Sequence, residues 1–369
     1  MHAIAATPEL KLQTVVCGQH LETRFGETWK AIANDGFDIS EKVVIGLAED
    51  TRLATATATG TAVSGLAEAF ERLKPDIVLV LGDRFEIFAA GAAATILRIP
   101  LAHIHGGEVT EAAMDDAFRH SLTKMAHLHF AAAKPYAARI LQMGEDPEHV
   151  FVSGAPGLDH ISTQQLMSRG KLAQDLGINL ADLFFVVTYH PVTLEADYGT
   201  AATEQLIAAL ENFPTASVVF TGVNSDPGHT KISAILSGFC ADDPDRRKLV
   251  QSLGQCRYLS AVKEANAVIG NSSSGIIEAP SLFTPSVNMG DRQKGRLRSP
   301  SVIDCGETAA GITNAINQAL SPDFLKSISS QDPAYGRGGN ASAQIVEILK
   351  TADLAQLSIK PFKDIITAP

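Results

Sequence analysis

The sequence predicts an α/β fold made of two successive sets of parallel strands with helices between them. Short, continuously apolar runs such as DIVLVLGD (76–83) and FFVVTYH (184–190) are typical of strands that a parallel sheet buries on both faces. Segments of helical length separate these runs, so strands and helices alternate along the chain. With 369 residues, 45% of them apolar, the chain is long enough for two domains that each have a core.

The first half, residues 1–160, is expected to form one Rossmann-like domain. We expect strands at 13–17, 43–47, 76–83, 101–105 and 128–132, and a last strand and turn within 149–159. We expect helices at 25–35, 51–73, 85–97 and 135–143, and an amphipathic helix that ends shortly before residue 128.

The second half, residues 161–340, repeats this architecture after a polar segment at 162–171 that we interpret as a domain joint. Strands are expected at 184–190, 217–223, around Tyr258, at 267–270 and at 285–289, and helices at 201–211, 229–239, 260–266 and 274–280. The tail from 341 is expected to be helical to residue 357 and to pack back on the body. A cleft between the two halves is the expected ligand site.

The charge balance limits the classes of partner. The net charge of −11 argues against nonspecific binding to nucleic acid or to an anionic membrane. An anionic small substrate would then need a local basic patch. The longest apolar block, 87–97, is too short to span a bilayer, and the chain shows no signal-peptide pattern.

The cysteines point to a reducing compartment. Cys17, Cys240, Cys256 and Cys305 are scattered and form no CxxC pair. This spacing fits reduced thiols in a cytoplasmic protein better than a disulfide framework or a zinc site, and we expect no metal site.

The stretch 103–130, HIHGGEVTEAAMDDAFRHSLTKMAHLHF, is the strongest candidate for an acid/base site. A glycine pair after a strand allows close approach of the backbone to a ligand. Glu108, Asp115 and Asp116 follow it, where open α/β sheets place their ligands. The alternative for these carboxylates is helix capping and solvated charge.

A second acidic position closes the strand at 76–83. In GDRFE, Asp83 and Arg84 stand at the same expected edge of the sheet as Glu108. Asp83 is either a further acid/base group or the N-cap of the next helix. The planar fork of Arg84 matches phosphate oxygens.

The second half offers a histidine and a serine-rich turn. His190, in TYHPVT, stands at a strand end, where it is either functional or structural. In GNSSSGIIEAP (270–280), Ser272 and Ser273 lie at an expected strand-to-helix turn that can bind an anion, and Glu278 can accept ribose hydroxyls. A serine N-cap and an exposed glutamate are the alternatives.

A basic run supplies the patch that an anionic substrate requires. GDRQKGRLR (290–298) places Arg292, Lys294, Arg296 and Arg298 within seven residues of an acidic protein. The alternative is a solvated basic loop.

Taken together, these motifs resemble the hydrolysing UDP-N-acetylglucosamine 2-epimerases, most of all their sialic-acid and legionaminic-acid pathway branches. GDRFE, HIHGGEVT, MDDAFRHSLTKMAH, YHPVT, GNSSSGIIEAP and VNMGDRQKGR occur in the family's order over nearly the whole chain. The resemblance implies a GT-B fold, no organic cofactor such as nicotinamide, and a homo-oligomer, a dimer or a tetramer.

The resemblance also implies roles for single residues. Asp83, Glu108 and Asp115 match the family's acidic catalytic positions, and His190 matches its catalytic histidine. The expected substrate or UDP contacts are Arg84, Asn224, Ser272, Ser273, Glu278 and Arg292. The implied reaction releases UDP and the free 2-epimeric amino sugar through a glycal, from UDP-N-acetylglucosamine or a UDP-diacetamido-trideoxyhexose. A GT-B glycosyltransferase and an inactive UDP-sugar-binding chain are the alternatives.

The sequence departs from the family pattern at its start. Members open with a strand and a GTR-type loop, whereas residues 13–17 match the family's second strand. In a doubly wound sheet of order 3-2-1-4-5-6 the first strand lies between strands two and four. We therefore expect the segments 13–17 and 76–83 to lack a common neighbour, and we expect poor solubility or weak UDP binding.

Overall fold

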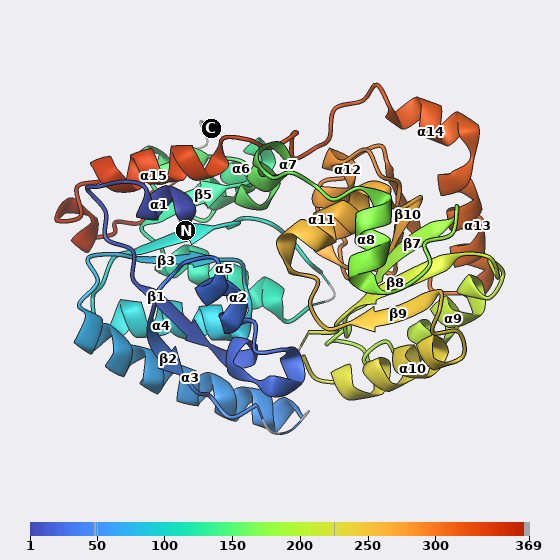
Figure 1. The fold of residues 1–369 in the computed structure, drawn as a ribbon. Coiled ribbons are helices and arrows are strands. Elements are labelled where there is room, and N and C mark those ends of the chain that lie inside the picture. The colour runs from blue at the N-terminus through green and yellow to red at the C-terminus, as the bar shows by residue number, and fades with distance from the viewer. Residues whose placement is uncertain (48, 50, 112, 225, 365–369) are drawn as a thin grey trace. The chain divides into compact units, whose positions relative to one another are not determined.

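The computed structural model describes residues 1–47, 49, 51–111, 113–224 and 226–364. These residues fall into two compact units, which we describe separately. Unit 1 comprises Met1–Val109, Met114–Asp159 and the segment from Asn340 on, and unit 2 comprises Thr110–Ala113 and His160–Gly339. Both units contain parallel sheets covered by helices (Figure 1).

Unit 1 alternates strands and helices as the apolar pattern predicts. Its strands are β1 (Thr14–Cys17), β2 (Ile39–Val43), β3 (Val78–Leu81), β4 (Leu101–Ile104), β5 (Leu128–Ala131) and β6 (Val150–Val152). Its helices are α1 (His2–Ala5), α2 (Trp29–Asn34), α3 (Arg52–Leu73), α4 (Phe85–Ile96), α5 (Asp115–Met125), α6 (Lys134–Gln142) and α15 (Ala341–Thr351).

The two faces of the unit 1 sheet carry different helices. Val80 and Leu101 pack into one core cluster with α3 and α4, which lie side by side in Figure 1. Ala102 and Phe130 face the opposite cluster, which includes Ile345 of α15. The chain's end thus covers one face of the sheet, and α15 lies beside α1 (Figure 1).

The parallel strands of unit 1 form two separate sheets. Within the described part of the chain, β1 pairs only with β2, and β3 begins a four-stranded sheet of order β3-β4-β5-β6. The expectation that 13–17 and 76–83 lack a common neighbour is confirmed. Leu81 of β3 is 52% exposed, a consequence of this open edge.

Unit 2 contains one six-stranded parallel sheet of order β12-β11-β10-β7-β8-β9. Its strands are β7 (Phe184–Thr188), β8 (Ser217–Thr221), β9 (Arg247–Val250), β10 (Ala267–Gly270), β11 (Ser286–Met289) and β12 (Val302–Cys305). Its helices are α8 (Arg169–Leu176), α9 (Thr200–Leu210), α10 (His229–Ala241), α11 (Gly254–Glu264), α12 (Glu278–Ser281), α13 (Ala309–Leu320) and α14 (Pro322–Ile328), and α7 (Asp159–Thr163) spans the boundary.

The central strand β7 shows why its first four positions are all apolar. Successive side chains of a strand point to opposite faces. Phe185 and Val187 pack in the cluster with α9, α10 and α13, whereas Phe184 and Val186 pack in the cluster with α8 and α11. All of β7 is buried, and only its last position, Thr188, is polar.

Several expected elements are wrong in position or type. The strand expected at 43–47 lies earlier, as β2 (Ile39–Val43). Tyr258 lies in helix α11, and the strand expected around it is β9 (Arg247–Val250). The helix expected at 274–280 is a 3-10 turn, Ser273–Gly275, followed by the four-residue helix α12. The end of the polar segment 162–171 belongs to helix α8. The sequence did not lead us to expect β12, α13 and α14.

Among the described residues, none of the helices has the length and apolar character needed to cross a membrane.

Candidate functional site

The loop after β3 places Asp83 at the carboxyl end of the sheet in unit 1. Gly82 takes a left-handed backbone, with φ of +83°, which turns the chain sharply before Asp83. The N-cap residue of α4 is Arg84, without a side-chain cap, so the interpretation of Asp83 as a helix cap is wrong. The Asp83 carboxylate instead forms an ion pair with the guanidinium of Arg119.

Arg84 is held against a buried carboxylate. Its Nε lies 3.2 Å from Oε2 of Glu86, whose side chain is 7% exposed, and its own side chain is 25% exposed. The guanidinium is therefore fixed in position while one side of it remains accessible.

Glu108 is fully buried at the end of β4. Its Oε1 lies 2.6 Å from Nδ1 of His105, which has an unusual left-handed backbone with φ of +68°. Such backbone strain in non-glycine residues is concentrated at functional sites. The turn also requires Gly107, because an added Cβ there would overlap the Tyr136 carbonyl oxygen.

The first turn of α5 carries Asp115 and Asp116. Asp115 is 6% exposed, and carboxylates at this end of a helix interact favourably with its dipole. Asp116 accepts a hydrogen bond from Arg119 at 2.9 Å. Arg119 thereby connects the first turn of α5 to the loop that carries Asp83.

The side chain of His103, in β4, holds the loop after β3 that carries Asp83. Its Nε2 lies 2.8 Å from the Gly82 carbonyl oxygen, to which the ring N–H donates. Complete burial lowers the pKa of His103 to about 4, although the hydrogen bond to Gly82 opposes this effect. The ring is therefore neutral at pH 7.

In unit 2, His190 follows β7 and is fixed by two asparagines. Asn271 spans its backbone, because Oδ1 accepts from His190 N–H at 2.8 Å and Nδ2 donates to the His190 carbonyl at 2.8 Å. The backbone N–H of Asn224 donates to His190 Nδ1 at 3.3 Å. A ring nitrogen that accepts carries no proton, so in this arrangement the His190 ring proton is on Nε2.

The serine turn after β10 is tight rather than the start of a long helix. Gly270 must be glycine, because a Cβ would overlap the Thr188 carbonyl oxygen. Ser272 caps the 3-10 turn by accepting from Ser274 N–H at 3.3 Å, and Ser273 is the first residue of that turn. Glu278 is the first residue of α12 and does not lie inside a helix that begins at residue 274, as the sequence had led us to expect.

Within the basic run, Arg292 differs from its neighbours. Lys294 pairs with Glu111 at 3.2 Å and Arg298 pairs with Asp304 at 3.0 Å. Arg292 instead donates to the backbone carbonyl of Asn271 at 3.1 Å. Its charge is thus placed beside the turn that carries Ser272.

Two residues connect the predicted site positions and were not assigned a role from the sequence. Arg119 is 1% exposed and bridges Asp83 and Asp116. Asn271 is fully buried and holds His190 and Arg292. Each of the two residues is polar and lies inside a sequence motif, which could have marked it as a candidate. Their partners Asp83 and His190 lie 36 and 81 positions away in the chain, so the sequence did not indicate these contacts.

Comparison with known proteins gives the family. Residues 2–350 match the family model described as UDP-N-acetylglucosamine 2-epimerase. The chain is 36% identical over 364 residues to the Campylobacter jejuni protein named GDP/UDP-N,N'-diacetylbacillosamine 2-epimerase (hydrolyzing), covering 99% of this chain and 94% of that protein. It is 35% identical over 347 residues to the UDP-N,N'-diacetylbacillosamine 2-epimerase (hydrolyzing) of Legionella pneumophila, with coverages of 94% and 89%.

Solved structures share the fold. The UDP-GlcNAc 2-epimerase of Neisseria meningitidis, bound to UDP-GlcNAc, matches with a TM-score of 0.77 and 19% identity, over 94% of this chain and 93% of that one. A 2-epimerase from Listeria monocytogenes matches with a TM-score of 0.76 and 21% identity, over 99% and 94%. The fold is thus of the GT-B type, with two parallel-sheet α/β units. The chain belongs to the UDP-N-acetylglucosamine 2-epimerase family.

Proposed function

We propose that the chain is a hydrolysing 2-epimerase that converts a UDP-2,4-diacetamido-2,4,6-trideoxyhexose to UDP and the free 2-epimeric sugar. The observation that carries this proposal is the group of carboxylates, Asp83, Glu108 and Asp115, at the carboxyl edge of the unit 1 sheet, in a chain of this family. The relatives named for diacetylbacillosamine are 35–36% identical over nearly the whole chain. A relative named for UDP-N-acetylglucosamine is 30% identical over 314 residues, which makes that sugar nucleotide the second candidate.

The chemistry explains why several carboxylates are needed. No carbonyl stands next to the C2 hydrogen of the sugar, so direct removal of that proton is unfavourable. When UDP leaves with the C1–O electron pair, C1 gains oxocarbenium character and the C2 hydrogen becomes acidic. One carboxylate removes it and a glycal forms. A proton then returns to C2 from the opposite face and water adds at C1, so each face needs its own acid/base group.

In unit 1 we assign the proton transfers to the three carboxylates. Glu108 is positioned by His105, and Asp83 by Arg119. Asp115 sits in the first turn of α5, whose amino-terminal dipole stabilises negative charge. We assign Arg84 to a substrate contact, because Glu86 fixes its guanidinium while part of it stays exposed.

In unit 2 we assign the binding of UDP. Arg292 supplies positive charge beside the turn that carries Ser272 and Ser273, and Glu278 follows as an acceptor for ribose hydroxyls. With its proton on Nε2, His190 can donate a hydrogen bond to the departing diphosphate. Asn224 is assigned to a further substrate contact.

The experiment is incubation of the chain with each sugar nucleotide in deuterium oxide, with UDP release and the free sugar followed by NMR. Elimination predicts one solvent deuterium at C2 of the inverted sugar. Retention of the original C2 hydrogen rejects this mechanism and indicates simple hydrolysis. UDP release only after addition of an acceptor would instead identify a glycosyltransferase, and UDP binding without turnover would identify an inactive chain.

We place the enzyme in the cytoplasm as a homo-oligomer. All four cysteines are free thiols, which fits a reducing compartment. Light scattering of the purified chain measures its oligomeric state directly, and a monomer would contradict this part of the proposal.

A further inference from the structure

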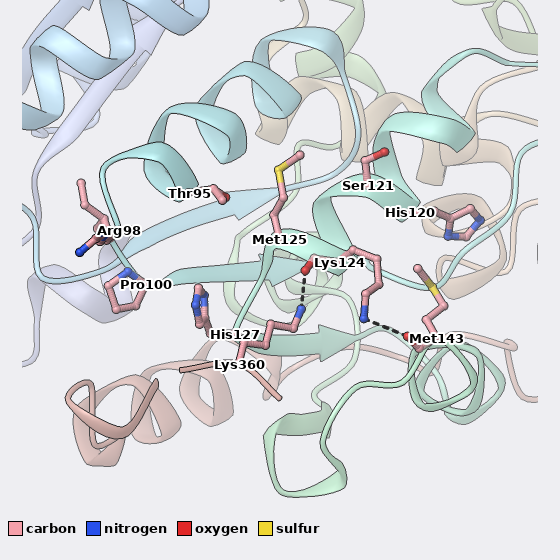
Figure 2. A pocket seen from close by; sticks show the side chains of 11 residues that line it. Thr95, Arg98, Pro100, His120, Ser121, Lys124, Met125, His127, Met143 and Lys360 are labelled. Atoms are coloured by element: carbon pink, nitrogen blue, oxygen red, sulfur yellow. Dashed lines mark hydrogen bonds between the residues drawn. The ribbon is translucent and has the colours of Figure 1, made fainter. Parts of the chain in front are cut away.

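Unit 1 has a cavity at the edge of the sheet opposite to Asp83 and Glu108. Its volume is about 700 Å³, and Pro100, which precedes β4, and His127, which precedes β5, both line it (Figure 2). Thr95 near the end of α4 and Met125 at the end of α5 add to the wall. The cavity therefore lies at the amino-terminal ends of β4 and β5, and it shares no residue with the proposed reaction site.

Positive charge dominates this cavity in a protein of net charge −11. Arg98, Lys124 and Lys360 line it, and no aspartate or glutamate occurs among its described lining residues. Glu145 does not line the cavity, but its carboxylate accepts hydrogen bonds from two residues that do, Lys124 at 2.5 Å and Lys360 at 2.7 Å. Two lysines share this one carboxylate and Arg98 adds a third cation, so positive charges exceed negative charges by two.

Buried Glu145 acts as the anchor of the two lysines. Burial alone would raise its pKa, but hydrogen bonds from His129, Lys124 and Lys360 outweigh burial and lower the pKa to about 2. The carboxylate thus stays ionised and keeps both ammonium groups at the cavity.

Three donors from different segments remain for a ligand. Lys124 Nζ makes two hydrogen bonds, to Glu145 and to the Met143 carbonyl at 2.9 Å, and also lies 4.8 Å from the centroid of the Phe362 ring, which leaves its third N–H without a hydrogen bond among the described residues. His127 Nδ1 accepts from Leu101 N–H at 3.1 Å, so its proton is on Nε2. Arg98 is exposed, and no ion pair involving it occurs among the described residues.

The remaining wall is apolar and is formed by side chains such as Ile99, Pro100, Met125 and Met143. A cavity of this volume is in the range of small-molecule sites, and is larger than one inorganic phosphate needs. A guanidinium fork, an ammonium and a neutral N–H match the oxygens of a phosphate group. We propose that this cavity binds a small phosphate-bearing molecule as a second ligand site, separate from the UDP-sugar residues.

The chain's tail closes one side of this site. All three N–H groups of Lys360 Nζ are used, by Glu145 and by the carbonyls of Thr123 and Lys124. The Phe362 ring packs on Gly144, where an added Cβ would overlap it, and Lys363 N–H donates to the Gly144 carbonyl at 2.9 Å. A bound anion beside Lys360 should therefore stabilise the tail, and slow the hydrogen exchange of the Lys363 amide.

The test is calorimetric titration of the full chain, in the presence of saturating UDP, with two probes: inorganic pyrophosphate and glucosamine 6-phosphate. We expect binding of at least one probe with a dissociation constant below about 1 mM. Arg98→Gln and Lys124→Gln should each weaken binding about tenfold or more, the effect of losing a charged hydrogen bond. Lys11→Gln, which removes an exposed cation outside the cavity, should change nothing.

Arg98 is exposed, so its replacement leaves the fold intact even if Lys124→Gln destabilises the chain. Equal binding of both probes supports the site. Tighter binding of glucosamine 6-phosphate also supports it, and shows in addition that the apolar wall contacts the sugar. Absence of binding by both probes, or equal affinity in wild type, Arg98→Gln and Lys124→Gln, overturns the proposal. The comparison of variants holds whether or not the chain turns over a UDP-sugar.

Discussion

Arg119 of α5 bridges the carboxylates of Asp83 and Asp116 while its own side chain is 1% exposed. Removal of one partner from a buried ion pair leaves an uncompensated charge, which typically costs about 3–5 kcal/mol. Arg119 thus holds the side chain of Asp83 in position, although Arg119 lies in another element of unit 1, 36 residues later in the chain.

The first prediction is that Arg119→Gln lowers both stability and turnover. We expect a loss of up to about 3 kcal/mol in the free energy of unfolding, because two partly exposed carboxylates lose their shared cation. Turnover should fall by at least about tenfold, because a misplaced acid/base group transfers protons less efficiently. Urea unfolding and the rate of UDP release measure these two effects.

Arg119→Lys is the matched control. It keeps the charge but replaces the fork by a single ammonium, which cannot reach both carboxylates with the same geometry. We expect partial recovery of stability with turnover still reduced. Turnover equal to wild type in Arg119→Gln would mean that Asp83 needs no positioning by Arg119.

The second prediction concerns the three carboxylates. Asp83→Asn, Glu108→Gln and Asp115→Asn should each reduce kcat by about two to four decades, the usual contribution of a general acid or base. UDP affinity, measured by calorimetry, should change little, because we assign UDP binding to unit 2. Asp116→Asn is the control next in the chain, and we expect a smaller loss. A variant with normal turnover removes that carboxylate from the mechanism.

The third prediction separates Arg292 from the rest of the basic run. Arg292→Ala should weaken UDP binding by about 1.5–3 kcal/mol, the range for a hydrogen bond to a charged group. Lys294→Ala and Arg298→Ala should have little effect, because their charges are already paired with Glu111 and Asp304. Equal losses in all three variants would show that the run acts only through its summed charge.

The fourth prediction follows from buried His103. Its pKa is about 4 in the folded protein, lowered mainly by burial, and about 6.5 in an unfolded chain. Between these values the unfolded chain binds a proton that folded His103 does not, so stability falls as the pH falls from about 6.5 to 4. The full effect is about 3 kcal/mol.

The measurement is urea unfolding of wild type and His103→Gln between about pH 4.5 and 6.5. Glutamine can still donate to the Gly82 carbonyl but does not titrate in this range. We expect a smaller decrease in stability for the variant. Parallel curves for the two proteins would show that His103 does not contribute to the pH dependence.

The strands that the sequence predicted poorly share one physical property. β2, β9 and β12 are all edge strands of their sheets, and each carries charged residues such as Lys42, Lys248 or Asp304. Edge strands are partly exposed, and charge on them discourages pairing with other chains. Their apolar signal is therefore weak, whereas a buried strand such as β7 has a run of apolar residues, Phe184 to Val187, and was predicted.

For the candidate site, too, the sequence suggested some residues and missed others. Motifs at strand ends led us to predict Asp83, Glu108 and His190 as site residues, because parallel sheets place their ligands at the carboxyl ends of their strands. The partners that fix these side chains were not predicted. Asn271 and His190 are 81 residues apart in the chain, and only the pairing of β10 with β7 brings them together.

The last prediction concerns the open edge of β3. Val78 and Gly82 N–H groups donate to the β4 side, so the backbone groups of Leu79 and Leu81 face away from β4. An open edge with an exposed apolar side chain is a template for pairing with another chain. We expect the 369-residue chain to associate increasingly with concentration, and Leu81→Lys to reduce this association, as measured by sedimentation velocity. Ile96→Lys, at a still more exposed apolar residue of helix α4, is the control and should have less effect. A chain that stays monodisperse at all concentrations, or equal effects of the two substitutions, would contradict association through the β3 edge.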